Sequence, residues 1–404
     1  MDKDLKEKTL AELEQIVVML GQKKYLAGYI FSFIHDKGIG EISQITPLSK
    51  ALRAQLTEQN YFISQLKILR KLTDPDGTIK YLFELSDGNR IETVLLFDSP
   101  LRINRRERRE RKEEIEIKNS ATSACSAVKM NGMGGSNISR GKGRKTLCVS
   151  TQVGCAMNCA FCATAKVRLR RDLTAAEIVD QVNAVQKDEG RISNVVYMGM
   201  GEPLLNYDAV VKSVRILNDP AGKNIGIRHI TVSTCGVVPA IKKLAEEDIH
   251  PRLAVSLNAP TDALRAQLMP VGAKYSIAGL IEAANLYRLK AKQRVTFEYV
   301  LMKGVNDTVL HAQMLARLLR HIRCRVNLIE FNPHPGCEFA ASGRERIERF
   351  AGVLEEAGIK TTVRFKMGQS IKAACGQLGG RVGWEGRRMK DELEDSRPRT
   401  CDEK

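Results

Sequence analysis

Apolar residues recur every three or four positions over the first sixty residues, a spacing that places them on one face of a helix. The dipeptide Thr46-Pro47 is a helix start signal before the last of these stretches. The pattern predicts three helices, over residues 10–20, 29–34 and 49–59.

The apolar period shortens to two between residues 61 and 97, as it does in a half-buried strand. Two alternating runs, 80–85 and 90–96, flank an Asp-Gly-Asn turn at 87–89. Alternating runs around such a turn predict a β-hairpin. We therefore expect residues 1–98 to form a small accessory domain of helices and a hairpin.

Residues 99–145 differ in composition from the rest of the chain. Six arginines and one lysine lie between positions 102 and 112, and a polar, Gly-rich stretch follows around 132–136. Such a composition does not bury a core, so it predicts an exposed, partly disordered insertion. Its charge would either add phosphate contacts or, as is commoner for a charge run, form a solvated face.

From residue 146 onward, strand patterns alternate with amphipathic helical patterns. The predicted strands are 146–153, 194–198, 229–234, 252–258, 294–302, 325–332 and 360–365. The predicted helices are 175–187, 207–217, 238–246, 277–290, 309–322 and 344–356. Six strand–helix units in series predict an α/β fold with a parallel sheet and helices outside, as a partial barrel or a doubly wound sheet. In either arrangement the site lies at the carboxyl ends of the strands.

Charge is the one feature of the composition that indicates a class of partner. The 404 residues are 43% hydrophobic and 27% charged, as in an ordinary globular protein, and no run of 18 apolar residues predicts a membrane span. The N-terminus has no apolar segment of the secretory type. Lys and Arg number 64 against 47 Asp and Glu, a net charge of +17. This excess favours a nucleic acid partner over the alternative of a basic but solvated surface.

The ten cysteines are too widely spread for a disulfide scaffold, but three of them are clustered. Cys155, Cys159 and Cys162 form a C-x₃-C-x₂-C run in the loop after the first predicted barrel strand. Three thiolates at this spacing can hold one face of a four-iron cluster and leave one iron open. Structural zinc normally needs a fourth ligand, and no Cys or His supplies one nearby. The cluster is favoured over zinc or structural thiols, and it predicts a reducing, cytoplasmic location.

A second motif, Met-Gly-Met-Gly-Glu-Pro at 198–203, ends the next predicted strand. Its glycines let backbone approach a ligand closely, and Glu202 can pair with an ammonium group. Alone, this motif is a weak signal, because a plain strand-to-helix turn also accounts for it.

Together the two motifs resemble the radical S-adenosylmethionine (SAM) superfamily. The chain as a whole resembles one of its families, the dual-specificity adenine C2-methyltransferase of 23S ribosomal RNA and transfer RNA. Seven segments in chain order carry this resemblance: 90–94, 146–155, 198–206, 232–239, 256–260, 330–333 and 373–378. It extends over about residues 5–100 and 146–380 and excludes the insertion.

The resemblance implies a radical route, since adenine C2 is not nucleophilic and cannot take SAM's methyl by simple displacement. It implies that Cys375 carries the methyl group and that a 5′-deoxyadenosyl radical removes a hydrogen atom from it. The resulting carbon adds to the base, Glu92 accepts the base proton, and Cys148 attacks the adduct sulfur to release product. By pattern alone, each thiol would be a buried structural Cys and Glu92 an exposed strand residue.

The resemblance also implies the cofactors, a [4Fe-4S] cluster on Cys155, Cys159 and Cys162 with SAM on the fourth iron. Asn258 departs from the His often found at its position, but an amide still donates and accepts hydrogen bonds. The remaining cysteines are interpreted as core or chance thiols. The implied SAM contacts are Gly201, Glu202, Ser233, Ser256, Leu257, Asn258 and Asn332.

The sequence therefore predicts a partial (βα)₆ radical SAM barrel with a small helical N-terminal domain. The expected domains are 1–98, which binds RNA, the insertion 99–145, the barrel 146–372 and a tail 373–404. The expected partners are 23S rRNA, tRNA and an electron donor of the flavodoxin type, with no membrane, for a monomer. Two alternatives remain at this stage: the sister family that methylates adenine C8, and a non-enzymatic RNA-binding iron–sulfur or zinc protein.

Overall fold

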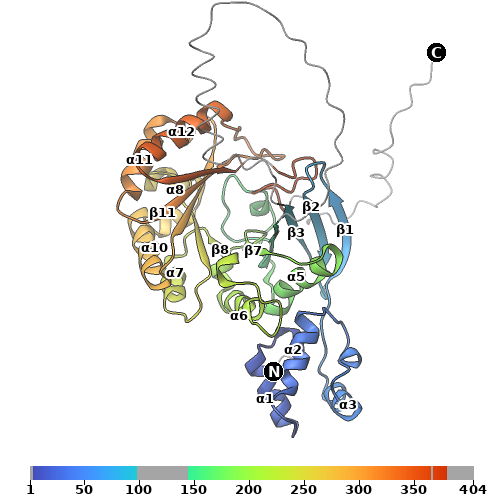
Figure 1. Ribbon diagram of the computed structural model, residues 1–404. Helices are drawn as coiled ribbons and strands as arrows, with labels where there is room; N and C mark the ends of the chain where they lie inside the picture. Colours follow the sequence, from blue (N-terminus) through green and yellow to red (C-terminus); the bar gives the residue numbers. More distant parts are fainter. Residues whose placement is uncertain (1–2, 98–143, 365–366, 380–404) are drawn as a thin grey trace, which may run out of the picture.

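The computed structural model describes residues 3–97, 144–364 and 367–379 (Figure 1). The predicted insertion up to residue 143 and the tail from residue 380, with Cys125 and Cys401, lie outside the described residues.

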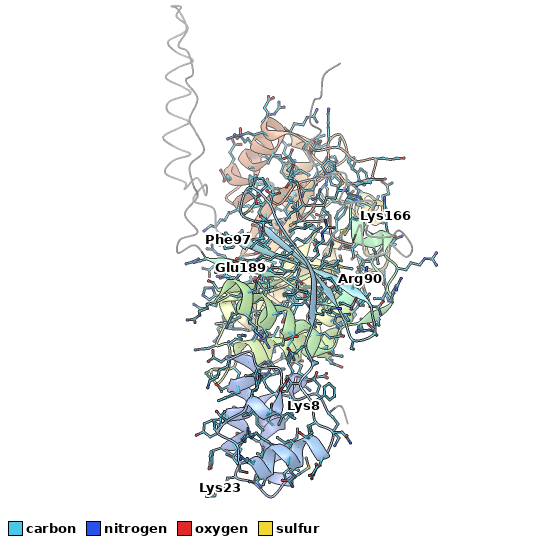
Figure 2. The ribbon with its side chains drawn as sticks, turned by 90° about the vertical axis from the view of Figure 1, so that its right-hand side faces the viewer. Lys8, Lys23, Arg90, Phe97, Lys166 and Glu189 are labelled. Atoms are coloured by element: carbon cyan, nitrogen blue, oxygen red, sulfur yellow. The ribbon has the colours of Figure 1, made fainter. Side chains whose placement is uncertain are left out.

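The N-terminal helices form where the apolar spacing predicts them. They are α1 (Leu10–Met19), α2 (Leu26–His35) and α3 (Lys50–Glu58), with short 3₁₀ turns η1 (Leu5–Glu7) and η2 (Ile42–Gln44). Thr9 and Glu12 form a capping box at the start of α1, and Ser49 caps α3. The three predicted helices are confirmed. They lie together below the sheet in Figure 1, and Figure 2 shows Lys23 at the far end of this unit and Lys8 near the barrel.

Buried charge joins the N-terminal helices to the barrel. Lys6 forms an ion pair with Asp180, and both side chains are under a tenth exposed. The second oxygen of Asp180 accepts the backbone N–H of Leu66 at 2.6 Å. Removing either charge would leave the other buried and unpaired, so the pair fixes how the two units meet.

His35, at the end of α2, is fully buried beside this pair, and neither ring nitrogen has a hydrogen-bond partner. It packs on Phe31 at a ring distance of 4.5 Å. Burial, and then the nearby charges of Lys6 and Lys223, hold the pKa of His35 well below its usual value.

We expect this histidine to make stability fall with acidity. Below about pH 6.5 the unfolded chain gains a proton on His35 that the native protein cannot accept, so the native state loses stability as pH falls. Between pH 7.5 and 5.5 the free energy of unfolding should fall by about 1.4 kcal/mol more in the wild type than in His35→Phe, measured by urea unfolding. The exposed His321→Gln is the control. Identical pH dependence in wild type and His35→Phe would contradict the assignment.

The predicted hairpin is present and continues the barrel sheet. Strands β2 (Ile79–Glu84) and β3 (Arg90–Phe97) are antiparallel, and β1 (Lys67–Thr73) pairs with β2 at the edge. β3 pairs antiparallel with the first barrel strand, so one ten-stranded sheet runs through both units. β1 was not among the predicted runs because it is a mostly exposed edge strand without an apolar alternation.

Seven parallel strands follow in sequence order, β4-β7-β8-β9-β10-β11-β12. Their bounds are β4 Lys145–Cys148, β7 Asn194–Tyr197, β8 Ile230–Thr234, β9 Arg252–Ser256, β10 Val295–Leu301, β11 Cys324–Glu330 and β12 Lys360–Arg364. A doubly wound sheet would reverse its strand order at a switch point, and this sheet does not. The partial (βα)₆ barrel is therefore confirmed, with its helices on the outer side (Figure 1).

The six predicted barrel helices are also present. They are α5 Ala175–Glu189, α6 Tyr207–Asn218, α7 Val238–Ala245, α10 Ile277–Ala291, α11 Val309–Leu319 and α12 Arg344–Glu356. Two short helices, α8 (Asp262–Leu268) and α9 (Val271–Lys274), and the 3₁₀ turns η3 (Ala163–Lys166), η4 (Pro203–Leu205) and η5 (Ile227–His229) were not predicted. Within the described ranges, no helix has the length and apolar character needed to span a membrane.

The first predicted barrel strand, 146–153, is wrong as a single element. It divides into β4 and a separate strand β5 (Gln152–Val153), which pairs with β6 (Arg171–Asp172) in a small second sheet. The side chain of Gln181 on α5 accepts the N–H of Ser150 and donates to its carbonyl oxygen. These two bonds take the place of a neighbouring strand, so the ladder stops after Cys148.

Candidate active site

The clustered cysteines lie in the loop after β5, at the carboxyl end of the barrel. Gly154 has a φ of +84° and approaches the carbonyl of Arg168 so closely that a Cβ would lie 2.3 Å from it. Only glycine fits there, and it turns the chain into the loop that begins at Cys155. Cys159 is buried, whereas Cys155 and Cys162 are partly exposed.

The chemistry of this donor set fits an iron–sulfur cluster. Burial raises the pKa of Cys155 to about 12 and also raises that of Cys162, so a cation beside these thiols would favour their ionisation. In residues 3–97, 144–364 and 367–379, no three Cys, His, Asp or Glu side chains converge as ligands of a single ion do. A four-iron cluster takes one thiolate per iron, so its ligands stand further apart than those of one zinc ion.

Cys235, interpreted from the sequence as a core or chance thiol, lies in contact with this loop. Its sulfur is 3.8 Å from that of Cys159, and this contact, followed by burial, raises the pKa of Cys235 well above its usual value. Cys324 lies in the main core, and the Cys337 thiol is 3.6 Å from the carbonyl oxygen of Ala160.

The Gly-Glu motif forms the turn after β7. Gly201 has a φ of +100°, and a Cβ there would lie 2.6 Å from the Cβ of Gln152. Glu202 is buried, and its two carboxylate oxygens accept the N–H groups of Leu204 at 3.0 Å and Cys235 at 2.7 Å. Burial raises the pKa of Glu202 despite these bonds. The carboxylate thus joins the β7 and β8 loops beside the clustered cysteines.

The other predicted SAM contacts lie on or just after β8, β9 and β11. Ser233 and Ser256 are partly exposed, and Leu257 is fully buried. Asn258, with φ +59°, accepts the N–H of Val300 at 2.8 Å and contacts the sulfur of Met269 at 3.2 Å. Its side chain therefore holds the loop after β9 in place. Asn332 donates to the carbonyl oxygen of Cys375 at 3.1 Å, so it contacts the segment of the predicted methyl carrier.

The segment around Cys375 crosses the barrel opening between β3 and the loop that carries Cys155, Cys159 and Cys162, which we call the cluster loop. On the cluster side, Ala163 donates its N–H to the carbonyl of Gly376 at 2.7 Å, and the Thr164 hydroxyl donates to that of Leu378 at 2.8 Å. On the other side, Leu378 packs in one apolar cluster with Val94 and Cys148. The two thiols predicted to react are thus brought to the same end of the barrel.

Cys148 and Cys375 share an electrostatic environment. Burial, and then the Cys375 thiolate, raise the pKa of Cys148 to about 12. The Cys375 residue is exposed to solvent. Desolvation of its thiol by the surrounding protein nevertheless raises the pKa of Cys375, and the charge of the Arg364 guanidinium and its hydrogen bond to the thiol oppose this rise. The charge of Glu298 raises the pKa of Arg364, so the guanidinium stays charged beside the thiol. Sequence reasoning did not identify Arg364 or Glu298, since each is one polar residue in a strand pattern.

Glu92 is buried rather than exposed. Its carboxylate accepts the N–H of Gly379 at 2.7 Å and forms an ion pair with Lys80 at 3.1 Å. Its backbone carbonyl accepts a hydrogen bond from the Ser150 hydroxyl at 2.6 Å. A carboxylate, two thiols and a three-cysteine loop therefore surround the carboxyl end of the barrel.

Comparison with known proteins gives the family that the sequence resemblance implies. The family models “Radical SAM superfamily” and “Ribosomal RNA large subunit methyltransferase N-terminal domain” match residues 149–314 and 3–62. The chain is 42% identical to “Probable dual-specificity RNA methyltransferase RlmN” of Thermoanaerobacter sp. (strain X514), over 93% of this chain and 97% of that one. The chain belongs to the RlmN family. Identity to the RlmN of Syntrophobacter fumaroxidans is 40%, over 94% of this chain and 98% of the relative.

A solved structure supports the fold as well as the family. A radical SAM methyltransferase from Sphaerobacter thermophilus superposes with a TM-score of 0.78 at 42% identity, covering 94% of this chain and all of that one. The predicted family, the radical SAM fold and the enzyme class, an RNA methyltransferase, are thereby confirmed. Membership of the superfamily implies chemistry that depends on SAM and a four-iron cluster.

Proposed function

We propose that this RlmN-family enzyme methylates C2 of adenine in 23S rRNA and in tRNA, with the methyl group carried on Cys375. The observation that carries the proposal is the packing of the Cys375 segment between Glu92 and Cys148 on one side and the cluster loop on the other. A non-enzymatic RNA-binding protein has no use for this arrangement.

Each residue has one task in this proposal. Cys375 takes a methyl group from one SAM as its thiolate, which the Arg364 guanidinium favours. A bound cluster and a second SAM would supply the one-electron chemistry that takes a hydrogen atom from that methyl group and accepts the electron released later. The remaining carbon bonds to C2, and Glu92 accepts the C2 proton. Cys148 then attacks the Cys375 sulfur, the carbon–sulfur bond breaks, the product carbon gains a proton, and a disulfide forms for an external reductant to open.

The same proposal assigns the cofactor contacts. Cys155, Cys159 and Cys162 would bind three irons, and SAM would occupy the fourth near Gly201 and Glu202. Further SAM contacts would come from Ser233, Ser256, Leu257, Asn258 and Asn332.

The N-terminal domain, residues 1–98, is proposed to bind the RNA, with the barrel over 146–372. Tyr25 and Tyr29 are 63% and 42% exposed and pack edge to face next to Lys23 and Lys24, which suits contact with bases and phosphates. The eight described cysteines are free thiols, which supports a reducing, cytoplasmic location. The proposal also includes a monomer and a donor of the flavodoxin type.

Analysis of the product nucleoside tests the proposal. Anaerobically reconstituted enzyme, labelled SAM and unmodified RNA should give 2-methyladenosine, separated from the 8-methyl isomer by retention and identified by mass. The 8-methyl product would instead assign the enzyme to the sister reaction. RNA retained without 5′-deoxyadenosine release would leave only the binding alternative.

A further inference from the structure

The two groups proposed to act on adenine C2 come from opposite ends of the chain. Glu92 lies on β3 of the N-terminal hairpin, and Cys375 lies after β12. The same carbon atom receives the methylene from Cys375 and loses its proton to Glu92. The carboxylate and the sulfur must therefore be held in a fixed relation to each other, because an error of about 1 Å in such a site can cost about 100-fold in rate.

The turn between β1 and β2 anchors the segment before Cys375. The Asp74 carboxylate accepts the N–H of Ser370 at 2.9 Å and its hydroxyl at 2.6 Å. Asp76 accepts the N–H of Gly368 at 2.7 Å. These bonds fix where the segment starts, but they lie several residues from the reacting thiol.

Lys80 makes the connection nearer the reacting groups. Its ammonium is 3.1 Å from one oxygen of Glu92 and donates to the carbonyl of Lys372 at 3.2 Å. The other oxygen of Glu92 accepts the N–H of Gly379. Glu92 is thus connected to the backbone on both sides of Cys375. Through Lys80 it is connected to Lys372, three residues before Cys375, and it bonds directly to Gly379, four residues after it.

The surroundings of Lys80 explain why the connection is rigid. The side chains of Lys80 and Glu92 are 8% and 5% exposed, so water does not compete strongly for either. Lys372 has a φ of +52°, a left-handed conformation that side-chain-bearing residues seldom adopt without support. The bond from Lys80 to its carbonyl helps to hold this turn.

We propose that Lys80 is a positioning residue that sets the Glu92 carboxylate against the methyl-carrying Cys375. The proposal rests on the function proposed above for Glu92 and Cys375. Lys80 itself touches neither the base nor SAM in this role. It acts at the step in which the C2 proton leaves the adduct, and not at the methylation of Cys375, which does not use Glu92.

The experiment follows both steps in Lys80→Met, Glu92→Gln and Lys80→Arg. In Lys80→Met, methylation of Cys375 by SAM should stay within about threefold of wild type, which also shows that the variant is folded. Release of methylated RNA should fall about 100-fold, and covalent protein–RNA adduct should accumulate as in Glu92→Gln. Lys80→Arg should restore much of the release. The control is Lys290→Met, which removes an exposed ion pair with Glu246 at the outer surface of the barrel and should behave as wild type.

A double variant shows whether Lys80 acts through Glu92. Lys80→Met/Glu92→Gln should release product within about threefold of Glu92→Gln alone, because residues acting on one step are not additive. Normal release by Lys80→Met while Glu92→Gln accumulates adduct would overturn the role of Lys80 alone. An equal loss of Cys375 methylation and of release would show a merely structural role and also overturn it. Normal release by Glu92→Gln would overturn the proposed function of Glu92 and the role of Lys80 with it.

Discussion

Replacing any one of Cys155, Cys159 or Cys162 by Ala is expected to abolish both the iron–sulfur cluster and RNA methylation. With two thiolates the loop cannot hold a four-iron cluster against solvent. Activity should therefore fall to the background of the assay rather than by a modest factor.

The measurements are iron content, the brown absorption of the purified protein and 5′-deoxyadenosine release under anaerobic reduction. The wild type should contain about four irons per chain. Cys337→Ala is a matched control, because this thiol lies 3.6 Å from the carbonyl oxygen of Ala160 in the same loop yet has no assigned role. A colourless, zinc-loaded preparation with full activity would contradict the cluster assignment.

The second large effect is expected at the two reacting thiols, and it differs between them. Cys148→Ala should still methylate Cys375 and form the covalent adduct with RNA, but it should fail to release the product. Denatured Cys148→Ala protein should therefore carry covalently bound RNA. Cys375→Ala should carry none, since it has no thiol to take the methyl group. Denaturing gel electrophoresis with labelled RNA separates the two outcomes, and identical behaviour of the two variants would contradict the assigned roles.

What the sequence could predict depended on how local each signal was. The three cysteines of the cluster loop lie within eight residues, and the βα periodicity is carried by each strand and helix separately. Both could be predicted from local sequence. Cys148 and Cys375 are 227 positions apart in the sequence. Their roles could be predicted only from the family resemblance, since nothing local to either thiol marks it as reactive.

The features that sequence reasoning missed are created by tertiary contacts. Lys80 is one charged residue in an apolar strand, and its importance depends on Glu92 and the carbonyl of Lys372, far away in the chain. The break after β4 likewise depends on Gln181 from α5, which replaces a strand partner at Ser150. Neither contact leaves a periodic pattern in the sequence.

The central claim is that the transferred carbon passes through Cys375, and an isotope experiment tests it most directly. Enzyme whose Cys375 has been methylated with CD₃-labelled SAM is freed of that SAM and given RNA and unlabelled SAM for one turnover. The account predicts that the methyladenosine carries two deuterium atoms, because one is lost to the radical and a proton completes the methyl group. A first-turnover product without deuterium would show that the methyl comes directly from the second SAM and would contradict the account.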